Sequence, residues 1–342
     1  MTYRHGSLEQ NWSKERDMAM RSEARLLILD NAAVGQLLQP EDVLHAVQEA
    51  FILHSKREGR VFPVVRESLN SGGIFGIKSG DVPAQDLLGF KAAGFWPANR
   101  QRGGEPHQAT IMLFDPTTGR PCCLIDGNAI TTARTGAAGG LGLDLFARAD
   151  SHQLCIFGSG VQARIQLTYA LRLRPNLNQV FYLTSNNNPD ASFEQQFSGR
   201  CSLQHTTHAN DAVASSDVII TATPGGGPLF DPEAVRPGTH LNCVGADTRG
   251  KRELPEGLLS MAKVYVDDEK QARQIGETQW AGQVSCTEIG DVMLKQQPAH
   301  RKPEDITIFD MTGLALQDLT VARVIQYRAQ ENSLGTQLPW PW

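Results

Sequence analysis

The sequence predicts an α/β protein with two sheets, and two different patterns of apolar residues along its 342 residues support this. From about residue 145, compact apolar runs alternate with helical lengths, which indicates a parallel sheet with right-handed crossovers. Between residues 59 and 125, short apolar runs are broken by glycine and proline, which is typical of the strands of a separate sheet. The chain exceeds the ~250–300 residues at which single cores stop growing, so two domains are expected.

The first domain is predicted to combine residues 1–145 with a returning tail at 311–342. Its polar first residues are expected to form an arm, followed by a strand at Leu26–Leu29. Pro40-Glu41-Asp42 then opens a helix, because proline and acidic side chains favour the first turn. A helix at Leu316–Gln326 would pack back on this split α+β domain. Its strands are expected at Val61–Val65, Ile74–Ile77, Leu87–Phe90 and Ile111–Phe114.

The second domain, residues 146–310, is predicted to contain the parallel sheet. Its strands are expected at Gln153–Phe157, Gln179–Thr184, Asp217–Ala222, His240–Gly245 and Lys263–Asp267. Each of these runs is short, apolar and separated from the next by a helical length, as in βαβ units.

The strongest local signal is the loop Gly158–Ala163, which reads Gly-Ser-Gly-Val-Gln-Ala and joins an apolar strand to an apolar-periodic helix. Gly158 permits a tight turn, Gly160 lets the backbone approach a pyrophosphate, and Ala163 lets the helix lie close to the sheet. A plain tight turn is the alternative interpretation of such a loop. The strand–loop–helix context favours a dinucleotide site, and hence a Rossmann-type, doubly wound parallel sheet domain.

The end of the second strand of this domain indicates which dinucleotide is bound. NAD sites usually place an acidic residue there to bind the ribose 2′-hydroxyl. This chain has Ser185 and Asn186 instead, with no acid before Asp190 and no arginine beside them. Hydroxyl and amide groups can donate to a 2′-phosphate that a carboxylate would repel. The sequence therefore predicts NADP(H) as the preferred cofactor, with NAD(H) as the alternative.

Composition and charge exclude several classes of partner. The net charge of −5 leaves no basic excess to hold a nucleic acid or an anionic membrane. No apolar run reaches the ~20 residues that span a bilayer, and the N-terminus lacks the apolar core of a secretory signal. The six cysteines form no CxxC pair, so a cytoplasmic location is expected and no metal site is predicted.

Cationic side chains interrupt the apolar strands of the first domain. Arg66, Lys91, His107 and Arg134 each stand in such a stretch. A substrate carboxylate needs a cation placed in advance, and arginine offers a bidentate fork. Lys91 lies on a strand that otherwise reads as buried, so it is either ion-paired in the core or functional. Any one of these residues is more often a surface or salt-bridged charge, and the hypothesis depends on their occurring together.

Asp247 would complete the site from the second domain. It follows the predicted strand His240–Gly245, and ligands of open α/β sheets bind beyond the carboxyl ends of the strands. Its carboxylate could exchange protons with an amine or a water. An N-cap or turn aspartate is the alternative interpretation.

These stretches resemble the ornithine cyclodeaminase/mu-crystallin family from about residue 26 to residue 328. The motifs that carry the resemblance are Phe90-Lys91, Pro106–Thr110, Leu113–Asp115, Asp126–Asn128, Arg134-Thr135, Gly158–Ala163 and Gly245–Asp247. The resemblance implies a Rossmann domain and a split sheet domain that joins its twin in a homodimer.

The resemblance also implies roles for individual residues. Arg66, Lys91 and Arg134 look like the cations that bind a carboxylate, and Lys91 and Asp247 like the catalytic pair, with Asp247 as the acid/base. Cofactor contacts are implied at Thr135, Gly158, Ser159, Gly160, Val161, Gln162, Ser185, Asn186, Ala222, Thr223, Val244, Gly245 and Gly313.

Members of this family deaminate or cyclise amino acids or reduce imines, and three stretches look most like the L-arginine dehydrogenase subgroup. They are Phe62–Glu67, Gly94–Asn99 and Gly103–Gln108, and iminosuccinate reductases share the first two. Glu105 beside His107, or Glu67, could receive a cationic head group, whereas Lys78 could receive a second carboxylate.

The resulting prediction is an NADP(H)-dependent L-amino acid dehydrogenase that converts a basic L-amino acid, L-arginine first, to its 2-oxo acid and ammonia. The reverse reaction is imine reduction. The alternatives are a ketimine or iminosuccinate reductase, an ornithine cyclodeaminase and a non-catalytic NADP(H)-binding protein. A pure binder could lose Lys91 or Asp247, and both are present.

Overall fold

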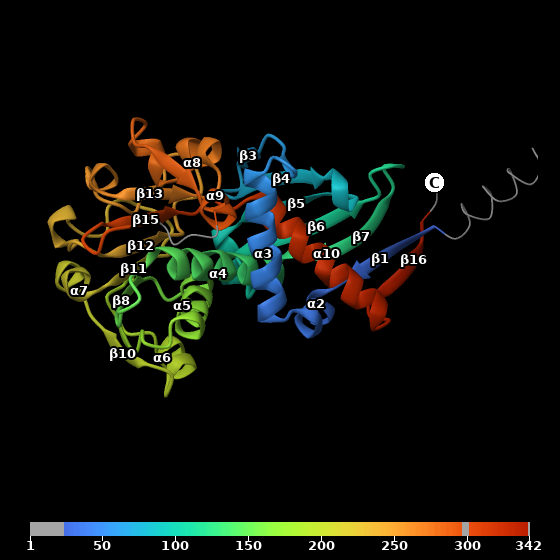
Figure 1. The fold of residues 1–342 in the computed structure, drawn as a ribbon. Coiled ribbons are helices and arrows are strands. Elements are labelled where there is room, and N and C mark those ends of the chain that lie inside the picture. Colours follow the sequence, from blue (N-terminus) through green and yellow to red (C-terminus); the bar gives the residue numbers. More distant parts are fainter. Residues whose placement is uncertain (1–23, 296–300, 341–342) are drawn as a thin grey trace, which may run out of the picture.

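The computed structural model describes residues 24–295 and 301–340, and the arm expected at the N-terminus lies outside these residues. The chain forms two lobes side by side, each built on an eight-stranded sheet (Figure 1). We call them the mixed-sheet lobe, residues 24–146 and 311–340, and the parallel-sheet lobe, residues 147–310. The α/β class predicted from the sequence is confirmed.

The mixed sheet has the strand order β16-β1-β7-β6-β5-β4-β2, with β3 paired to β4, and only β1 and β7 run parallel. One predicted strand, Val61–Val65, is wrong in its extent. Pro63 lies in its middle and has no N–H to donate to a ladder, so the chain forms two short strands instead. The strands are β1 (Arg25–Leu29), β2 (Arg60–Val61), β3 (Val65–Ser68), β4 (Ile74–Val82), β5 (Leu87–Phe95), β6 (His107–Phe114), β7 (Pro121–Asp126) and β16 (Thr336–Pro339).

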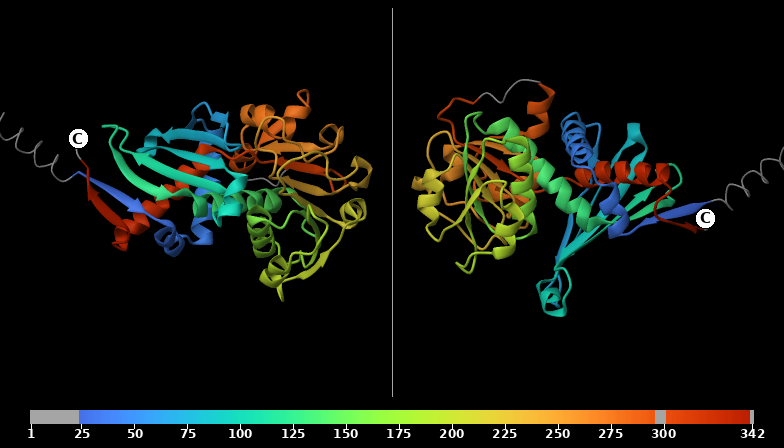
Figure 2. Two further views of the ribbon diagram at one scale, coloured as in Figure 1. Left: turned by 180° about the vertical axis from the view of Figure 1, so that it is seen from behind. Right: turned by 90° about the horizontal axis from the view of Figure 1, so that it is seen from below.

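Helices pack on one face of the mixed sheet (Figure 2). They are α2 (Asn31–Leu37), α3 (Pro40–Ser55), α4 (Gly127–Phe146) and α10 (Ala315–Glu331). Helix α3 begins at Pro40 as the sequence predicts, and α10 contains the predicted returning helix. Phe51 of α3, Ile111 of β6 and Leu319 of α10 are buried together in the core between helices and sheet. Each such side chain contributes about 1.5–3 kcal/mol on burial.

The parallel sheet has the strand order β10-β9-β8-β11-β12-β15-β13-β14, and every pair runs parallel. The five predicted strands are confirmed to within two residues at each end. The strands are β8 (Gln153–Phe157), β9 (Gln179–Leu183), β10 (Ser202–His205), β11 (Val218–Thr221), β12 (His240–Cys243), β13 (Lys263–Val266), β14 (Cys286–Glu288) and β15 (Thr307–Asp310).

Helices α5 (Val161–Leu173), α6 (Ala191–Phe197), α7 (Ala209–Ser215), α8 (Glu269–Ile275) and α9 (Ile289–Leu294) connect these strands. The chain leaves β8 for β9 on one side and later returns to β11 on the other side. This reversal of direction places a crevice at the carboxyl ends of β8 and β11, where open α/β sheets bind their ligands.

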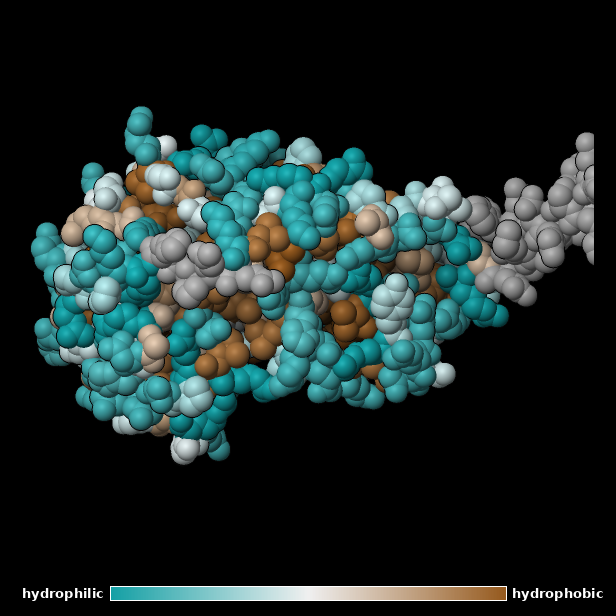
Figure 3. All heavy atoms as spheres, in the orientation of Figure 1, coloured by the Kyte–Doolittle hydropathy of each residue, from teal (hydrophilic) through white to brown (hydrophobic). Residues whose placement is uncertain are grey.

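In the described ranges, no helix combines the length and the apolar character that crossing a bilayer requires. The face seen in Figure 3 is mostly polar, with apolar side chains in separate patches.

Candidate active site

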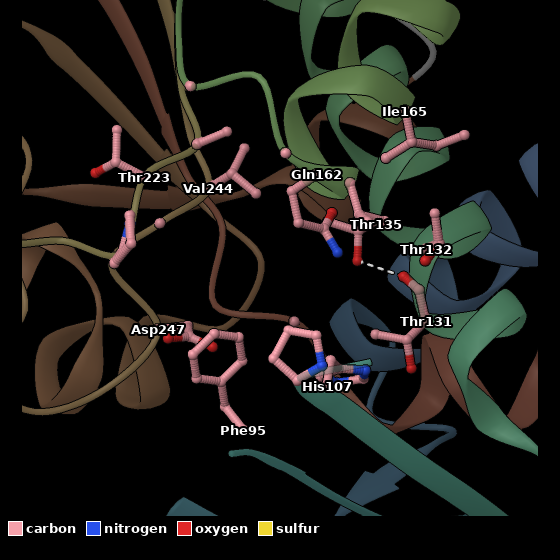
Figure 4. A pocket seen from close by; sticks show the side chains of 18 of the residues that line it. Phe95, His107, Thr131, Thr132, Thr135, Gln162, Ile165, Thr223, Val244 and Asp247 are labelled. Carbon is pink, nitrogen blue, oxygen red and sulfur yellow. Dashed lines mark hydrogen bonds between the residues drawn. The ribbon is translucent and has the colours of Figure 1, made fainter. Parts of the chain in front are cut away.

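A cavity of about 2260 Å³ lies between the two lobes. Mixed-sheet strands and α4 form one wall, and the loops at the carboxyl ends of β8, β11 and β12 form the other (Figure 4). Glu67, one of the two predicted receptors for a cationic head group, is exposed on β3 and does not line this cavity. The other site residues predicted from the sequence all line it. They are Arg66, Lys91, Glu105, His107, Arg134, Thr135, Gly158, Ser159, Gly160, Val161, Gln162, Ser185, Asn186, Ala222, Thr223, Val244, Gly245, Asp247 and Gly313.

Three cations of the mixed sheet face the same side of it because of strand register. Lys78 of β4 lies directly opposite Lys91 of β5, and Arg66 of β3 lies opposite Gly76, two residues before Lys78. Residues that are paired, or two apart on one strand, share a face. The antiparallel register therefore gathers Arg66, Lys78 and Lys91 at the cavity.

A buried carboxylate, Asp318 of α10, joins Lys91 to Arg134. Lys91 Nζ lies 2.7 Å from Asp318 Oδ2, and Arg134 Nε donates to Asp318 Oδ1 over 3.1 Å. Burial lowers the pKa of Lys91 to about 7, although Asp318 opposes the shift. Burial alone would raise the pKa of Asp318, but Arg134 and Lys91 hold it below its usual value. Asp318 is therefore ionised, whereas Lys91 is balanced between its charged and neutral forms at neutral pH.

Sequence reasoning missed Asp318, although one signal was available. Asp318 and Gln317 interrupt the apolar stripe of α10 and are both fully buried. Gly313, with φ +82°, lies just before Leu314, the N-cap of α10, and lets this helix approach α4. A Cβ at Gly313 would lie 2.7 Å from Arg134 Nη1, so glycine is required at this position.

Lys78 is buried in the same cavity without an anionic partner. Its Nζ donates to the carbonyls of Thr312 and Gly313 at 2.7 and 2.8 Å. Among the described residues, no carboxylate lies within ion-pair distance of this ammonium. Burial, reinforced by Arg134 and Arg66, lowers the pKa of Lys78 to about 8. The ammonium thus has only backbone carbonyls as direct acceptors, although the charges of Asp247 and Asp267 nearby partly oppose the lowering of its pKa.

Asp247 connects the two lobes. Arg66 Nη2 of the mixed-sheet lobe lies 3.2 Å from Asp247 Oδ2 and also donates to Thr248. Lys251 Nζ lies 2.7 Å from Asp247 Oδ1. Burial would raise the pKa of Asp247, but Lys251 and Arg66 hold it well below its usual range. Lys251 was not predicted from the sequence, although its position four residues after Asp247 suggests such a pair.

His107 and Glu105 lie at the end of β6, where the cavity opens. The ring Nδ1 of His107 lies 3.0 Å from Asn128 Oδ1. Burial and the nearby charge of Lys91 lower the pKa of His107, so its imidazole is neutral. Glu105 is exposed, and the side chains of Asn99 and Gln108 both donate to its backbone carbonyl.

The glycine loop has the geometry that a dinucleotide needs. Gly158 has φ +106°, and a Cβ there would lie 2.7 Å from the carbonyl oxygen of Ala222. Gly160 is the N-cap of α5, makes no side-chain cap and has open space where a side chain would stand. The first N–H groups of this 13-residue helix therefore face the cavity without a side-chain acceptor. Gln162 Oε1 is also buried without a partner. The two glycines and the first N–H groups of α5 fit a bound pyrophosphate.

The loop after β9 lines the far end of the cavity, where Ser185 and Asn186 were predicted to contact the cofactor. Asn186 Oδ1 accepts from the backbone of Asn188, so part of its amide is used in the turn. Asp190 accepts from Ser192 and Phe193 and pairs with Arg164 Nη2 at 3.1 Å. Sequence reasoning found no arginine near this loop because Arg164 lies on α5, more than twenty residues earlier.

Comparison with known proteins identifies the family. Residues 25–333 match the model of the ornithine cyclodeaminase/mu-crystallin family. The chain belongs to this family. The ornithine cyclodeaminase/mu-crystallin relatives include an iminosuccinate reductase from Paracoccus denitrificans, 31% identical over 92% of this chain and 99% of that protein. The family predicted from the sequence motifs is therefore confirmed.

Two solved structures of this family resemble the chain over almost their full length. An archaeal alanine dehydrogenase dimer with bound NAD has a TM-score of 0.85 at 32% identity, over 92% of this chain and 99% of that chain. Delta(1)-pyrroline-2-carboxylate reductase of Thermococcus litoralis, in complex with NADH and L-proline, has a TM-score of 0.84 at 27% identity, over 91% and 100%. The chain is an NAD(P)-dependent oxidoreductase of this family.

Proposed function

We propose that this oxidoreductase acts on the carbon of an amine or imine next to a carboxylate, as an L-amino acid dehydrogenase that also runs as an imine reductase. The supporting observation is the cavity wall itself, where Arg66, Lys91 and Arg134 stand opposite Asp247 and beside the glycine loop. The relatives support the same class, because they are named for alanine, iminosuccinate and pyrroline-2-carboxylate.

The cations hold and orient the substrate in this proposal. Arg66 and Arg134 offer forked N–H donors to the α-carboxylate, and Lys91 adds a point charge. Substrate would share Arg66 with Asp247, which it contacts in the described structure. A dinucleotide held by the glycine loop would supply or accept the hydride through its nicotinamide. Holding both partners in line can contribute ~7–11 kcal/mol to lowering the barrier.

In this proposal Lys91 transfers the proton, and Asp247 acts through its negative charge. A group with a pKa near the working pH transfers protons best, and Lys91 meets this condition. In the reducing direction its ammonium gives a proton to the substrate nitrogen. Asp247 stays ionised, so it attracts the substrate ammonium and orients the water that hydrolyses the imine.

NADP(H) is the preferred cofactor in this proposal. The loop at Ser185 and Asn186 offers hydroxyl and amide groups, and its nearest acid, Asp190, is already paired with Arg164. The two neighbours described above hold NAD or NADH, so NAD(H) is the alternative. The ratio of KM values for the two reduced cofactors decides between them.

Two features of opposite charge bear on the substrate side chain. Exposed Glu105 could receive the guanidinium of L-arginine, the substrate favoured by the sequence. Buried Lys78 could receive a second carboxylate, as in iminosuccinate or aspartate. A buried charge without a counter-charge costs more free energy than an exposed one. The geometry therefore supports a dicarboxylic substrate best, with L-arginine as the second candidate.

The protein acts as a cytoplasmic homodimer in this proposal. The face of the mixed sheet opposite the helices carries half-buried apolar side chains in register, Ile28, Leu124, Met112 and Phe90 on neighbouring strands. In the described structure these four side chains remain partly exposed. Pairing with a second copy would bury it, and the archaeal neighbour is a dimer.

One plate assay tests the proposal. NADPH or NADH is mixed with ammonia and a panel of 2-oxo acids that includes oxaloacetate, pyruvate and 2-oxo-5-guanidinopentanoate, and absorbance is followed at ~340 nm. L-aspartate and L-arginine are assayed in the oxidising direction. We expect turnover with oxaloacetate above all others. Turnover with the guanidino acid instead would favour L-arginine, and no turnover with any acid or imine would contradict the proposed reaction.

A further inference from the structure

A chain of three buried carboxylates lies behind the cofactor half of the cavity. Glu253, Glu277 and Asp310 are each at most 1% exposed. Among the described residues, none of the three pairs with a lysine, arginine or histidine. Burying a carboxylate without a cation costs free energy, so its oxygens must accept hydrogen bonds from other donors.

Backbone N–H groups donate these hydrogen bonds, from one acidic segment to the next. Asp310 accepts from the N–H groups of Glu277 and Thr278 at 3.0 and 2.9 Å. Glu277 accepts from the N–H groups of Glu253 and Leu254 at 2.6 and 3.3 Å. Each acid thus fixes the segment that carries the next one, and Glu253 is the last member, nearest the cavity.

Glu253 binds two loops of the cavity wall at once. Its Oε1 accepts from the Thr223 N–H at 2.7 Å and from the Thr223 hydroxyl at 2.6 Å. Its Oε2 accepts from the Gly245 N–H at 2.8 Å. Thr223 follows β11 and Gly245 follows β12, and both line the cavity beside Ala222 and Val244. The contact is close, because a Cβ on Gly245 would lie 2.4 Å from Glu253 Oε1.

The same segment also supports the catalytic loop. Asp247 and Lys251 lie on the six residues that precede Glu253, and Leu229 N–H donates to the Glu253 carbonyl at 2.9 Å. A shift of Glu253 would therefore move the loops at 223–229 and 245–251 together. Both loops face the crevice where the dinucleotide is proposed to bind.

We infer that Glu253 is a positioning residue for the cofactor site, where its carboxylate fixes the backbone of Thr223 and Gly245 against the bound nicotinamide half of the dinucleotide. This inference rests on the proposed function. Glu253→Gln replaces one acceptor oxygen with an NH₂ group that faces N–H donors. At least one buried N–H then loses its partner, and the two loops separate.

The matched control is Asp217→Asn. Asp217 is also buried and accepts from the N–H groups of His152 and Gln153, and unlike Glu253 it pairs with a cation, Arg148. It precedes β11, whereas Thr223 follows the other end of that strand. Both substitutions remove a buried acceptor of backbone amides from the same sheet. Only Glu253→Gln changes the cavity wall.

The test measures the dissociation constant of NADPH by fluorescence, together with kcat and KM, in the full-length protein. We expect Glu253→Gln to weaken NADPH binding about tenfold or more and to lower kcat. Asp217→Asn should lower Tm comparably and leave the dissociation constant within about twofold. If Glu253→Gln lowers Tm but binds NADPH like Asp217→Asn, the inference is overturned. If the wild type binds no dinucleotide, the proposed function itself fails.

A second pair of variants tests the role of Glu253 if Glu253→Gln does not fold. Thr223→Val removes the hydroxyl that donates to Glu253, and Thr223→Ser keeps it. We expect NADPH binding to be weaker in the valine variant than in the serine variant, because only valine lacks the donor to Glu253. Equal affinities in both would show that the contact with Glu253 does not position this wall.

Discussion

His54 ties the two lobes together through its charge, and its removal should destabilise the protein in a pH-dependent way. His54 of α3 belongs to the mixed-sheet lobe, and its Nε2 lies 3.0 Å from Asp268 Oδ2 and 3.5 Å from Glu288 Oε1 of the parallel-sheet lobe. Arg57 also pairs with Glu288. Burial alone would lower the pKa of His54, but the two carboxylates raise it from 6.5 to about 9.

The size and sign of the effect follow from linkage. A pKa of about 9 against 6.5 corresponds to about 3 kcal/mol of stability, at ~1.4 kcal/mol for each tenfold change. Because the folded-state pKa is raised, this contribution is complete below pH ~6.5 and is lost as the pH rises through ~9. The gap in stability between the wild type and His54→Gln should therefore be about 3 kcal/mol larger at pH 6 than at pH 10.

Urea unfolding of wild type and His54→Gln at pH 6, 8 and 10 measures this difference. His152→Gln is the control, because His152 also lies beside an aspartate, Asp217, but its side chain is 58% exposed. An exposed pair contributes at most about 1 kcal/mol, so this variant should stay close to the wild type throughout. A stability gap for His54→Gln that does not shrink between pH 6 and pH 10 would refute the reasoning.

Four further predictions follow from the site and the sheet. Lys91→Met should lower kcat/KM for imine reduction by about 100-fold or more and abolish the fall in wild-type rate above pH ~7; a retained pH profile would assign the proton to another group. Asp318→Asn leaves two buried cations without their partner and should cost about 3–5 kcal/mol in urea unfolding, whereas a neutral effect would argue against the ion pairs. Ser185→Asp should raise KM for NADPH about tenfold or more and leave KM for NADH unchanged. Equal changes in the two KM values would show that Ser185 does not contact the ribose. Leu124→Glu should convert the proposed homodimer to a monomer in light scattering, and a dimer of unchanged mass would place the interface elsewhere.

Sequence reasoning succeeded where the signal is local. Five of the eight strands of the parallel sheet were recognised as short apolar runs, whereas β10, β14 and β15 were not predicted. The loop at Gly158 was recognised by its small residues between a strand and a helix. The α3 start at Pro40 is equally local, because proline and acids favour a first turn. The error at Val61–Val65 has a local cause as well, since Pro63 was counted within a strand that it interrupts.

The missing parts of the site are those that only tertiary structure brings together. Asp318 is 227 residues from Lys91 in the chain, and nothing in the sequence around either residue points to the other. The Glu253 contacts depend on how three loops meet at the carboxyl edge of the sheet. Apolar periodicity predicts which residues are buried, but it does not identify the partner of a buried charge. Cations were therefore recognisable from the sequence, and most of their counter-ions were not.

Transfer of a labelled hydride tests the central claim most directly. The protein is incubated with NADPH deuterated at C4 on either face, ammonia and the best 2-oxo acid, and the amino acid is analysed by mass spectrometry. The account predicts one deuterium on the α-carbon from one face of the cofactor, and formation of this labelled amino acid about 100-fold more slowly with Lys91→Met. An amino acid formed without deuterium from either face, or no amino acid at all, would contradict it.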